Sequence, residues 1–191
     1  MDRISFDIYE PDGKKFHFIS NPNFIVFSLW AIVIFFFWKF SEISPPYSES
    51  REIILGIVLL INIYYLLTSF FKYKPLNGEM NGEIIFEADS VIINKKIFPI
   101  KSINNLNFWL GDYYGKKVIY GQSFSPSLYQ GVNNYVQFTD NLNQTQTIYF
   151  RMMTEHSYLS LCPFINEAVK LNKMQFKQAV DLVGYGNVSA N

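Results

Sequence analysis

The sequence predicts an α+β membrane protein, in which a transmembrane α-hairpin is followed by an antiparallel seven-stranded sandwich or barrel closed by a C-terminal helix. Two long apolar runs, then seven short stretches of alternating hydrophobicity, then a helical period from about Glu155 lead to this fold class. The 191 residues are formally neutral and 18% aromatic. Because Phe, Tyr, Ile, Asn and Lys all have A/T-rich codons, no single aromatic residue marks a site.

The two apolar runs have the length of membrane helices. Phe24–Phe40 spans 17 residues with Lys39 as its only charge, and Ile53–Phe71 spans 19 residues with none. A rise of about 1.5 Å per residue lets such segments cross the hydrocarbon core. Two buried core helices are the alternative, but helices that are apolar on every face would need a large soluble shell. We therefore expect a membrane part at residues 23–74, with helices at about 24–40 and 53–71.

The connector between the runs is short and contains Pro45 and Pro46, so the helices form an antiparallel hairpin with both termini on one side. Basic residues favour the cytoplasm as that side. Lys39 and Arg51 lie at the connector, whereas five basic residues flank the ends that face the termini: Arg3, Lys14, Lys15, Lys72 and Lys74.

Polar groups inside the runs are few. Neither run contains Asp, Glu, Arg or His, which disfavours a transporter or channel acting alone. Asn62 is able to hydrogen-bond to a neighbouring helix or to a polar spot within the hairpin, and we favour a structural role.

Residues 1–22 predict a small β-hairpin. Ile4, Phe6 and Ile8 alternate on one strand, Pro11-Asp12-Gly13 supplies a turn, and a second strand follows with Phe16 and Phe18. A two-stranded hairpin is marginal alone in water. It must therefore lean on the C-terminal domain, the membrane surface or a partner.

Residues 78–183 predict a cytoplasmic β domain with C-terminal helices, followed by a tail at 184–191. Thr154 is the expected N-cap of the first helix, Pro163 starts or kinks that helix, and a second helical segment at 173–183 ends at Gly184. The seven expected strands cover residues 83–87, 90–94, 96–100, 103–110, 116–121, 133–140 and 146–152.

Seven strands and a closing helix are the order of the pleckstrin-homology-like (PH-like) fold. The stretch GEIIFEADSVIINKKIFPIKSINNLNF resembles the opening strands of bacterial PH-like domains found beside paired membrane helices, with Asp89, Ile100, Ile103 and Leu106 at matching positions. The resemblance covers about Gly82 to Lys170. It implies a binding or scaffolding module at the bacterial inner membrane, without catalytic residues. The basic signature of phosphoinositide recognition is replaced by Glu87-Ala88-Asp89, so that specificity is not implied.

Enzymatic motifs are missing from the sequence: it has no GxSxG, HExxH, GxGxxG or phosphate-binding loop. His156 and Cys162 are six residues apart and do not share a helix face, so Cys162 is expected to be a buried structural residue. We expect no catalytic residue, no metal ligand and no cofactor.

Two functions remain open. In the first, the cytoplasmic domain is an interaction or scaffolding module, a subunit of a larger membrane complex. Residues 72–191 carry 11 basic and 9 acidic side chains, a balance that favours this function and disfavours nucleic acid. In the second, the protein is a sensor for a small ligand or for anionic lipid headgroups, which would be attracted by Lys72, Lys74, Lys95, Lys96, Lys101, Lys116 and Lys117.

The expected contact surface for a partner lies on two loops. FWLGDYYGKK, residues 108–117, predicts a strand end and a turn, and residues 121–134 form a long loop rich in Ser, Gly, Tyr and Asn. Such loops suit adaptable contacts around rigid aromatic anchors. The anchors we expect are Trp109, Tyr113, Tyr114, Phe124 and Tyr129.

Overall fold

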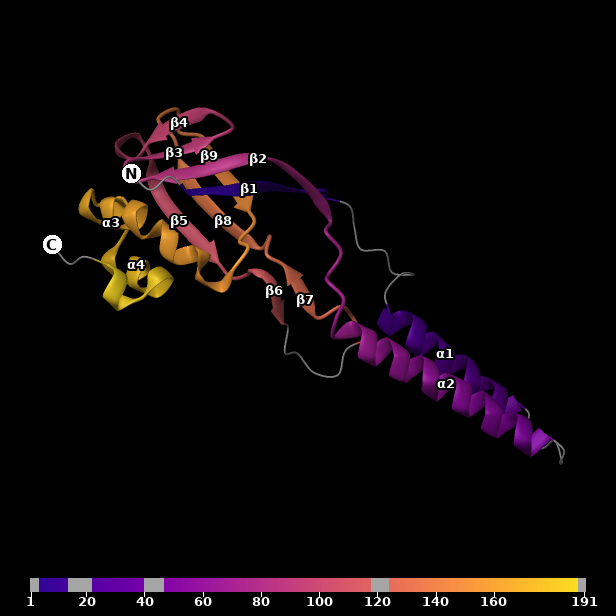
Figure 1. Ribbon diagram of the computed structural model, residues 1–191. Helices are drawn as coiled ribbons and strands as arrows, with labels where there is room; N and C mark the ends of the chain where they lie inside the picture. The colour runs from indigo at the N-terminus through magenta and orange to yellow at the C-terminus, as the bar shows by residue number, and fades with distance from the viewer. Residues whose placement is uncertain (1–3, 14–21, 40–46, 118–123, 189–191) are drawn as a thin grey trace. The chain divides into compact units, whose positions relative to one another are not determined.

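A computed structural model describes residues 4–13, 22–39, 47–117 and 124–188 of the chain (Figure 1). The chain divides into two compact units. The first, here called the sheet domain, comprises residues 1–13, 75–116 and 129–191; the second, the helical unit, comprises residues 14–74 and 117–128.

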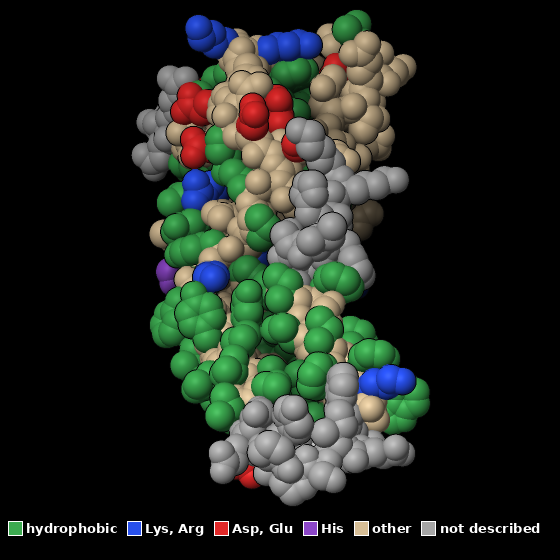
Figure 2. Space-filling model, turned by 90° about the vertical axis from the view of Figure 1, so that its right-hand side faces the viewer, with side chains coloured by type: hydrophobic (Ala, Val, Ile, Leu, Met, Phe, Trp, Pro, Cys, Tyr) green, Lys and Arg blue, Asp and Glu red, His purple; other side chains and the backbone are tan. Residues whose placement is uncertain are grey.

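The helical unit contains α1 (Pro22–Lys39) and α2 (Tyr47–Ser69), which confirms the two predicted apolar helices. Both are long and apolar enough to cross a membrane, and only 11% of each 18-residue apolar window is buried within the molecule. Phe27 and Trp38 are more than 70% exposed, and Figure 2 shows hydrophobic side chains covering much of the visible surface of this unit. A core helix of a soluble protein would be mostly buried. Length, composition and exposure together make both helices candidate membrane spans.

A polar contact between Trp30 and Asn62 joins the two helices. The indole Nε1 of Trp30 on α1 donates a hydrogen bond of 3.2 Å to Oδ1 of Asn62 on α2, while Nδ2 of Asn62 donates to the Val58 carbonyl at 2.7 Å. Asn62 therefore satisfies its amide inside the hairpin, in the structural role favoured from the sequence.

The sheet domain contains a seven-stranded antiparallel sheet (Figure 1), which confirms the α+β class. Its strand order is β4-β3-β2-β1-β9-β8-β5. The sheet does not close into a barrel: β4 and β5 form its two edges. The strands are β1 (Ile4–Pro11), β2 (Gly78–Glu87), β3 (Ser90–Ile93), β4 (Lys96–Pro99), β5 (Asn104–Leu110), β8 (Asn134–Thr139) and β9 (Thr145–Phe150).

The N-terminal strand lies in the middle of this sheet. β1 pairs with β2, where Phe6 is opposite Ile84, and with β9, where Ile8 is opposite Phe150. The structure thus assigns Ile4–Pro11 to the C-terminal domain; the second strand expected near Phe16 lies outside the described residues. The helical hairpin is an insertion between two neighbouring strands of one sheet.

The core of the sheet domain is largely aromatic. The ring of Phe86 packs 5.4 Å from that of Phe164 and 5.9 Å from that of Phe150, both in edge-to-face arrangements, and Phe98 packs 5.2 Å from Phe138. Edge-to-face pairs contribute about 0.5–1.5 kcal/mol beyond the burial of their area. The alternating pattern of the strands therefore supplies one buried face, which the C-terminal helices help to cover.

Those helices are α3 (Cys162–Lys170) and α4 (Phe176–Val183). A 3₁₀ helix, η3 (Glu155–Leu161), precedes α3; Thr154 is its N-cap and forms a capping box with Ser157. Pro163 lies in the first turn of α3, where its missing N–H costs nothing, so it begins the helix rather than kinking it. Gly184 follows α4 with φ +87°, as expected for a C-terminal glycine. Two further 3₁₀ turns, η2 (Ile100–Ser102) and η4 (Tyr185–Asn187), complete the elements.

A separate two-stranded sheet, here called the β6–β7 ribbon, replaces part of the predicted pattern. β6 (Tyr114–Lys117) pairs with β7 (Leu128–Gln130). The expected strand at 116–121 thus begins earlier, and residues 118–123 lie outside the described part of the chain. β7 falls inside the expected loop at 121–134, because a three-residue strand gives no alternating pattern long enough to be seen.

Candidate functional site

The turn between β5 and β6 is held by buried polar groups. Oδ1 of Asn134 accepts hydrogen bonds from the N–H groups of Gly111 and Asp112, both at 3.0 Å, and Nδ2 of Asn134 donates to the Gly131 carbonyl at 2.9 Å. Gly131 has φ +75°, and a Cβ there would lie 2.3 Å from the Met152 carbonyl oxygen. Side-chain amides and a required glycine thus fix the base of the β6–β7 ribbon, which sequence patterns do not reveal.

Asp112 is the buried acid of this turn. Its Oδ2 accepts a long hydrogen bond of 3.4 Å from the N–H of Asn133, and its Oδ1 is buried without a hydrogen-bond partner among the described residues. Burial raises the pKa of Asp112, while backbone N–H donors and the nearby Lys116 ammonium partly offset that increase. Because Asp112 bonds to the backbone of its own loop region, we assign it to fixing the turn.

Four of the five expected partner anchors belong to the sheet domain. Trp109 on β5 is 53% exposed, while Tyr113, Tyr114 and Tyr129 are half-buried. The guanidinium of Arg151 lies 4.7 Å from the ring centre of Tyr114, a cation–π contact that holds this ring in place. Trp109 is therefore the most accessible of these four residues.

The fifth anchor, Phe124, belongs to the helical unit. Its N–H donates to Oδ1 of Asn23 at the start of α1 (2.9 Å), and Nδ2 of Asn23 donates to Oγ of Ser125 (2.7 Å). Both the N–H and the hydroxyl of Ser127 donate to the carbonyl of Ser69, at 2.9 and 2.8 Å.

The segment 124–128 therefore contacts both helices at one end of the hairpin. The N–H of Leu128 donates to the Lys72 carbonyl at 3.2 Å, and the Leu128 carbonyl accepts a hydrogen bond from the Lys74 N–H at 2.7 Å. The bonds from Ser127 satisfy the carbonyl of Ser69, the last residue of α2, which has no partner within the helix. Part of the expected binding loop thus contacts the ends of the two apolar helices, a role the sequence does not signal.

The seven expected headgroup lysines are divided between the two units. Lys72, Lys74 and Lys117 lie in the helical unit. The other four lie in the sheet domain, where Lys116 donates to the Gly111 carbonyl at 2.6 Å and Lys96 lies 4.8 Å from the ring centre of Phe98.

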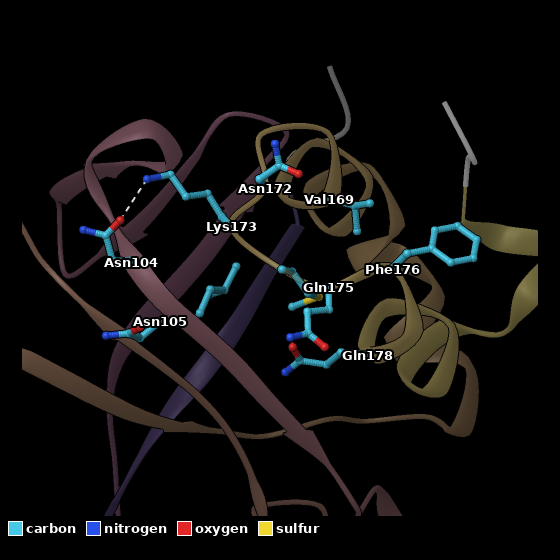
Figure 3. A pocket seen from close by; sticks show the side chains of 10 residues that line it. Asn104, Asn105, Val169, Asn172, Lys173, Gln175, Phe176 and Gln178 are labelled. Atoms are coloured by element: carbon cyan, nitrogen blue, oxygen red, sulfur yellow. Dashed lines mark hydrogen bonds between the residues drawn. The ribbon is translucent and has the colours of Figure 1, made fainter.

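A pocket that sequence reasoning missed lies between β5 and the C-terminal helices (Figure 3). Its volume is about 640 Å³, within the range of small-ligand sites. Lys173 donates to Oδ1 of Asn104 at 3.0 Å, and Gln178 donates to Asn107 at 2.7 Å beside it. Half of the lining residues carry a carboxamide, four are apolar and one is a lysine: Asn104, Asn105, Leu106, Val169, Asn172, Lys173, Met174, Gln175, Phe176 and Gln178.

This pocket offers hydrogen-bond donors and acceptors but little acid–base chemistry, because Lys173 is the only ionisable residue in its lining. It suits a polar, neutral or anionic ligand. The scattered Asn and Gln residues give no motif, and only the tertiary structure gathers them.

The net charge of the sheet domain differs from that of residues 72–191. The sheet domain carries 13 acidic and 9 basic side chains, whereas the helical unit carries 3 acidic and 7 basic ones. The weak basic excess of residues 72–191 disappears because β1 brings carboxylates into the sheet domain, while Lys72, Lys74 and Lys117 belong to the helical unit. A net charge of −4 disfavours attraction of the sheet domain to anionic lipid.

Metal-binding clusters of three or more His, Cys, Asp or Glu side chains do not occur in the part of the chain that the structure describes. Cys162 is half-buried, and burial raises the pKa of its thiol, which lowers the thiolate fraction available for reaction.

No protein-family model, curated protein or solved structure matches this chain. The resemblance to PH-like domains therefore stays a prediction.

Proposed function

We propose that the protein is a non-enzymatic integral membrane protein of the bacterial inner membrane, whose sheet domain is a cytoplasmic interaction or scaffolding module within a larger membrane complex. The observation that carries this proposal is the insertion of the helical hairpin between β1 and β2, which lie side by side in one sheet. Two strands of one folded domain occupy the same side of a membrane. The chain leaves that side after β1 and returns before β2, which supports a hairpin with both termini on one side.

The PH-like assignment belongs to the same proposal. The strands from β1 to β4 follow each other as neighbours at one part of the sheet, β9 and β8 continue it beside β1, β5 forms the far edge beside β8, and α3 follows β9 in the chain. This arrangement supports a seven-stranded module of that type, with the ribbon and the helical hairpin as insertions.

Affinity purification of the tagged full-length chain from native membranes, in mild detergent, tests the proposal. We expect another membrane protein to co-purify in a fixed ratio, and a single band of higher mass than the chain alone in native electrophoresis. Migration of the chain as a free monomer in several mild detergents would contradict it. A C-terminal fusion to a reporter that is active only in the periplasm should be inactive.

Binding of anionic lipid is the second candidate function. It is favoured by the position of Lys72 and Lys74 directly after α2 and by Lys117, which is exposed in the same unit. Native mass spectrometry of the full chain with added phosphatidylglycerol or phosphatidylcholine separates the two functions. Selective retention of phosphatidylglycerol that is lost in the K72Q/K74Q/K117Q variant would favour the lipid sensor, whereas equal retention of both lipids would exclude it.

A further inference from the structure

We propose that the outer face of the sheet, the face opposite the core, binds a Lys/Arg-rich segment that adjoins a membrane helix in another protein of the same membrane. This inference rests on the proposed function and specifies the chemistry of the partner. It is built on two independent features of one face, an aromatic row and an acidic strand pair.

The aromatic row crosses four strands in register. Trp109 on β5 lies opposite Tyr135 on β8, Tyr135 opposite Tyr149 on β9, and Tyr149 opposite Tyr9 on β1. Each of these residues alternates with a buried neighbour, so all four side chains point away from the core.

Some rings of the row are held by contacts with other residues, and one is exposed to solvent. The rings of Tyr135 and Tyr149 are 5.7 Å apart in an edge-to-face arrangement, and both are half-buried. Tyr9 is buried and its hydroxyl donates to the Asn77 carbonyl at 2.7 Å, whereas Trp109 is 53% exposed at the other end. The row therefore offers fixed ring surface, and its accessible end is at β5.

Carboxylates on β1 and β2 adjoin this row. Asp7, two residues before Tyr9 and on the same face, lies directly opposite Glu83. Further along the same strands Glu10 lies opposite Glu79, but this pair alternates with Tyr9 and points to the other face. All four are exposed, and Figure 2 shows acidic side chains gathered on the visible face of the sheet domain. β1 and β2 contain five acidic residues and no Lys or Arg.

Like charges directly opposite each other in a sheet are destabilising. In the described residues none of the four carboxylates has an ion pair, and Glu10 alone has a side-chain donor, Asn81 at 3.1 Å. Arg151 donates its backbone N–H to the Asp7 carbonyl, but its side chain donates to the Gln130 carbonyl and covers Tyr114. No cationic side chain of the described residues therefore relieves this repulsion, and a cation from a partner is able to do so.

A cationic segment matches both features. Lys and Arg bind the faces of aromatic rings, and Arg forms paired hydrogen bonds with carboxylates. Cytoplasmic segments next to membrane helices are enriched in Lys and Arg. A neighbouring membrane protein therefore presents such a segment close to this domain, whose net charge is −4.

The test uses the full chain in phosphatidylcholine nanodiscs and a fluorescent 12-residue probe of alternating arginine and serine, with a glutamate–serine probe for comparison. The wild type should bind the arginine probe, with an affinity that falls as salt rises. D7N/E83Q should bind it about tenfold more weakly, since two charge pairs at the surface together contribute about that factor. W109A should weaken binding severalfold. The matched control is E155Q/D181N, which also removes two acidic residues, both outside β1 and β2, and should leave binding unchanged.

Melting of D7N/E83Q at or above the wild-type temperature shows that the variant is folded, because the substitutions remove a repulsion. Failure of the wild type to bind the arginine probe would overturn the inference, as would an equal loss of binding in E155Q/D181N. Co-purification of the native complex distinguishes a failure of this inference from a failure of the proposed function. A partner that co-purifies equally with wild type and with D7N/E83Q/W109A contradicts the docking face alone, whereas no partner with the wild type contradicts the proposed function.

Discussion

Phe6 and Ile84 lie directly opposite each other on neighbouring strands, although the entire helical hairpin separates them in the chain. The ring of Phe6 also packs 5.1 Å from that of Phe150, a buried residue of β9. The first residues of the protein are thus part of the core, and both ends of the hairpin are tied to one folded domain.

Replacing Phe6 by Ala should destabilise the sheet domain by about 3–5 kcal/mol, because it removes a buried ring between two strands. Chemical unfolding of the full chain in detergent, followed by tryptophan fluorescence, measures the change. Ser5→Ala, one position away and exposed, should have little effect. A small effect of Phe6→Ala would mean that β1 is not an integral strand.

Replacing Asn62 by Leu should loosen the helical hairpin by about 1 kcal/mol, because it removes the hydrogen bond from Trp30. Disulfide cross-linking between cysteines introduced on α1 and α2 would report the change as a lower cross-linking yield. Ile63→Leu, at a position that is 43% exposed, is the matched control. Equal yields in the wild type and Asn62→Leu would show that the bond does not hold the helices together.

Replacing Asn23 by Ala should release the segment 124–128 at its contact with α1. The Phe124 amide loses its acceptor, and a bond of about 1 kcal/mol corresponds to roughly fivefold faster hydrogen exchange. Exchange measured by mass spectrometry should rise at Phe124 and remain unchanged at Ser127, whose acceptor is Ser69. Asn23→Asp keeps an acceptor oxygen and should preserve protection; loss of protection there would contradict the contact.

The turn at Asp112 should make stability depend on pH. Burial raises the pKa of this carboxyl above its ordinary value of 3.8, so the folded state favours the protonated form. The stabilisation is complete below the ordinary pKa and is lost as pH rises through the folded-state pKa. The melting temperature of the wild type, relative to that of Asp112→Asn, should therefore fall as pH increases from about 4. Parallel curves for the two proteins would show that Asp112 is not the group responsible.

Local patterns in the sequence were sufficient for most of the elements. Runs such as Ile53–Phe71 identify a helix by length and lack of charge, and the alternation around Val136 and Phe150 identifies strands, because each pattern reflects one buried face. Thr154, Pro163 and Gly184 mark helix ends through backbone chemistry that operates over a few residues.

Contacts between distant residues were not encoded in such patterns. The pairing of β1 with β2 and β9, the pocket lined by Asn104 and Gln178, and the hydrogen bonds from the segment 124–128 to Asn23 and Ser69 join positions far apart in the chain.

The sequence by itself determined that this chain has two membrane-length helices and an antiparallel sheet domain with C-terminal helices, since burial on one face leaves a periodic signal. Only the tertiary structure decided that the hairpin is inserted within the sheet, that the domain is net acidic, and that Trp109 shares a face with Asp7 and Glu83. Strand order and register depend on packing between segments that are far apart in the chain, and such packing leaves no local pattern in the sequence.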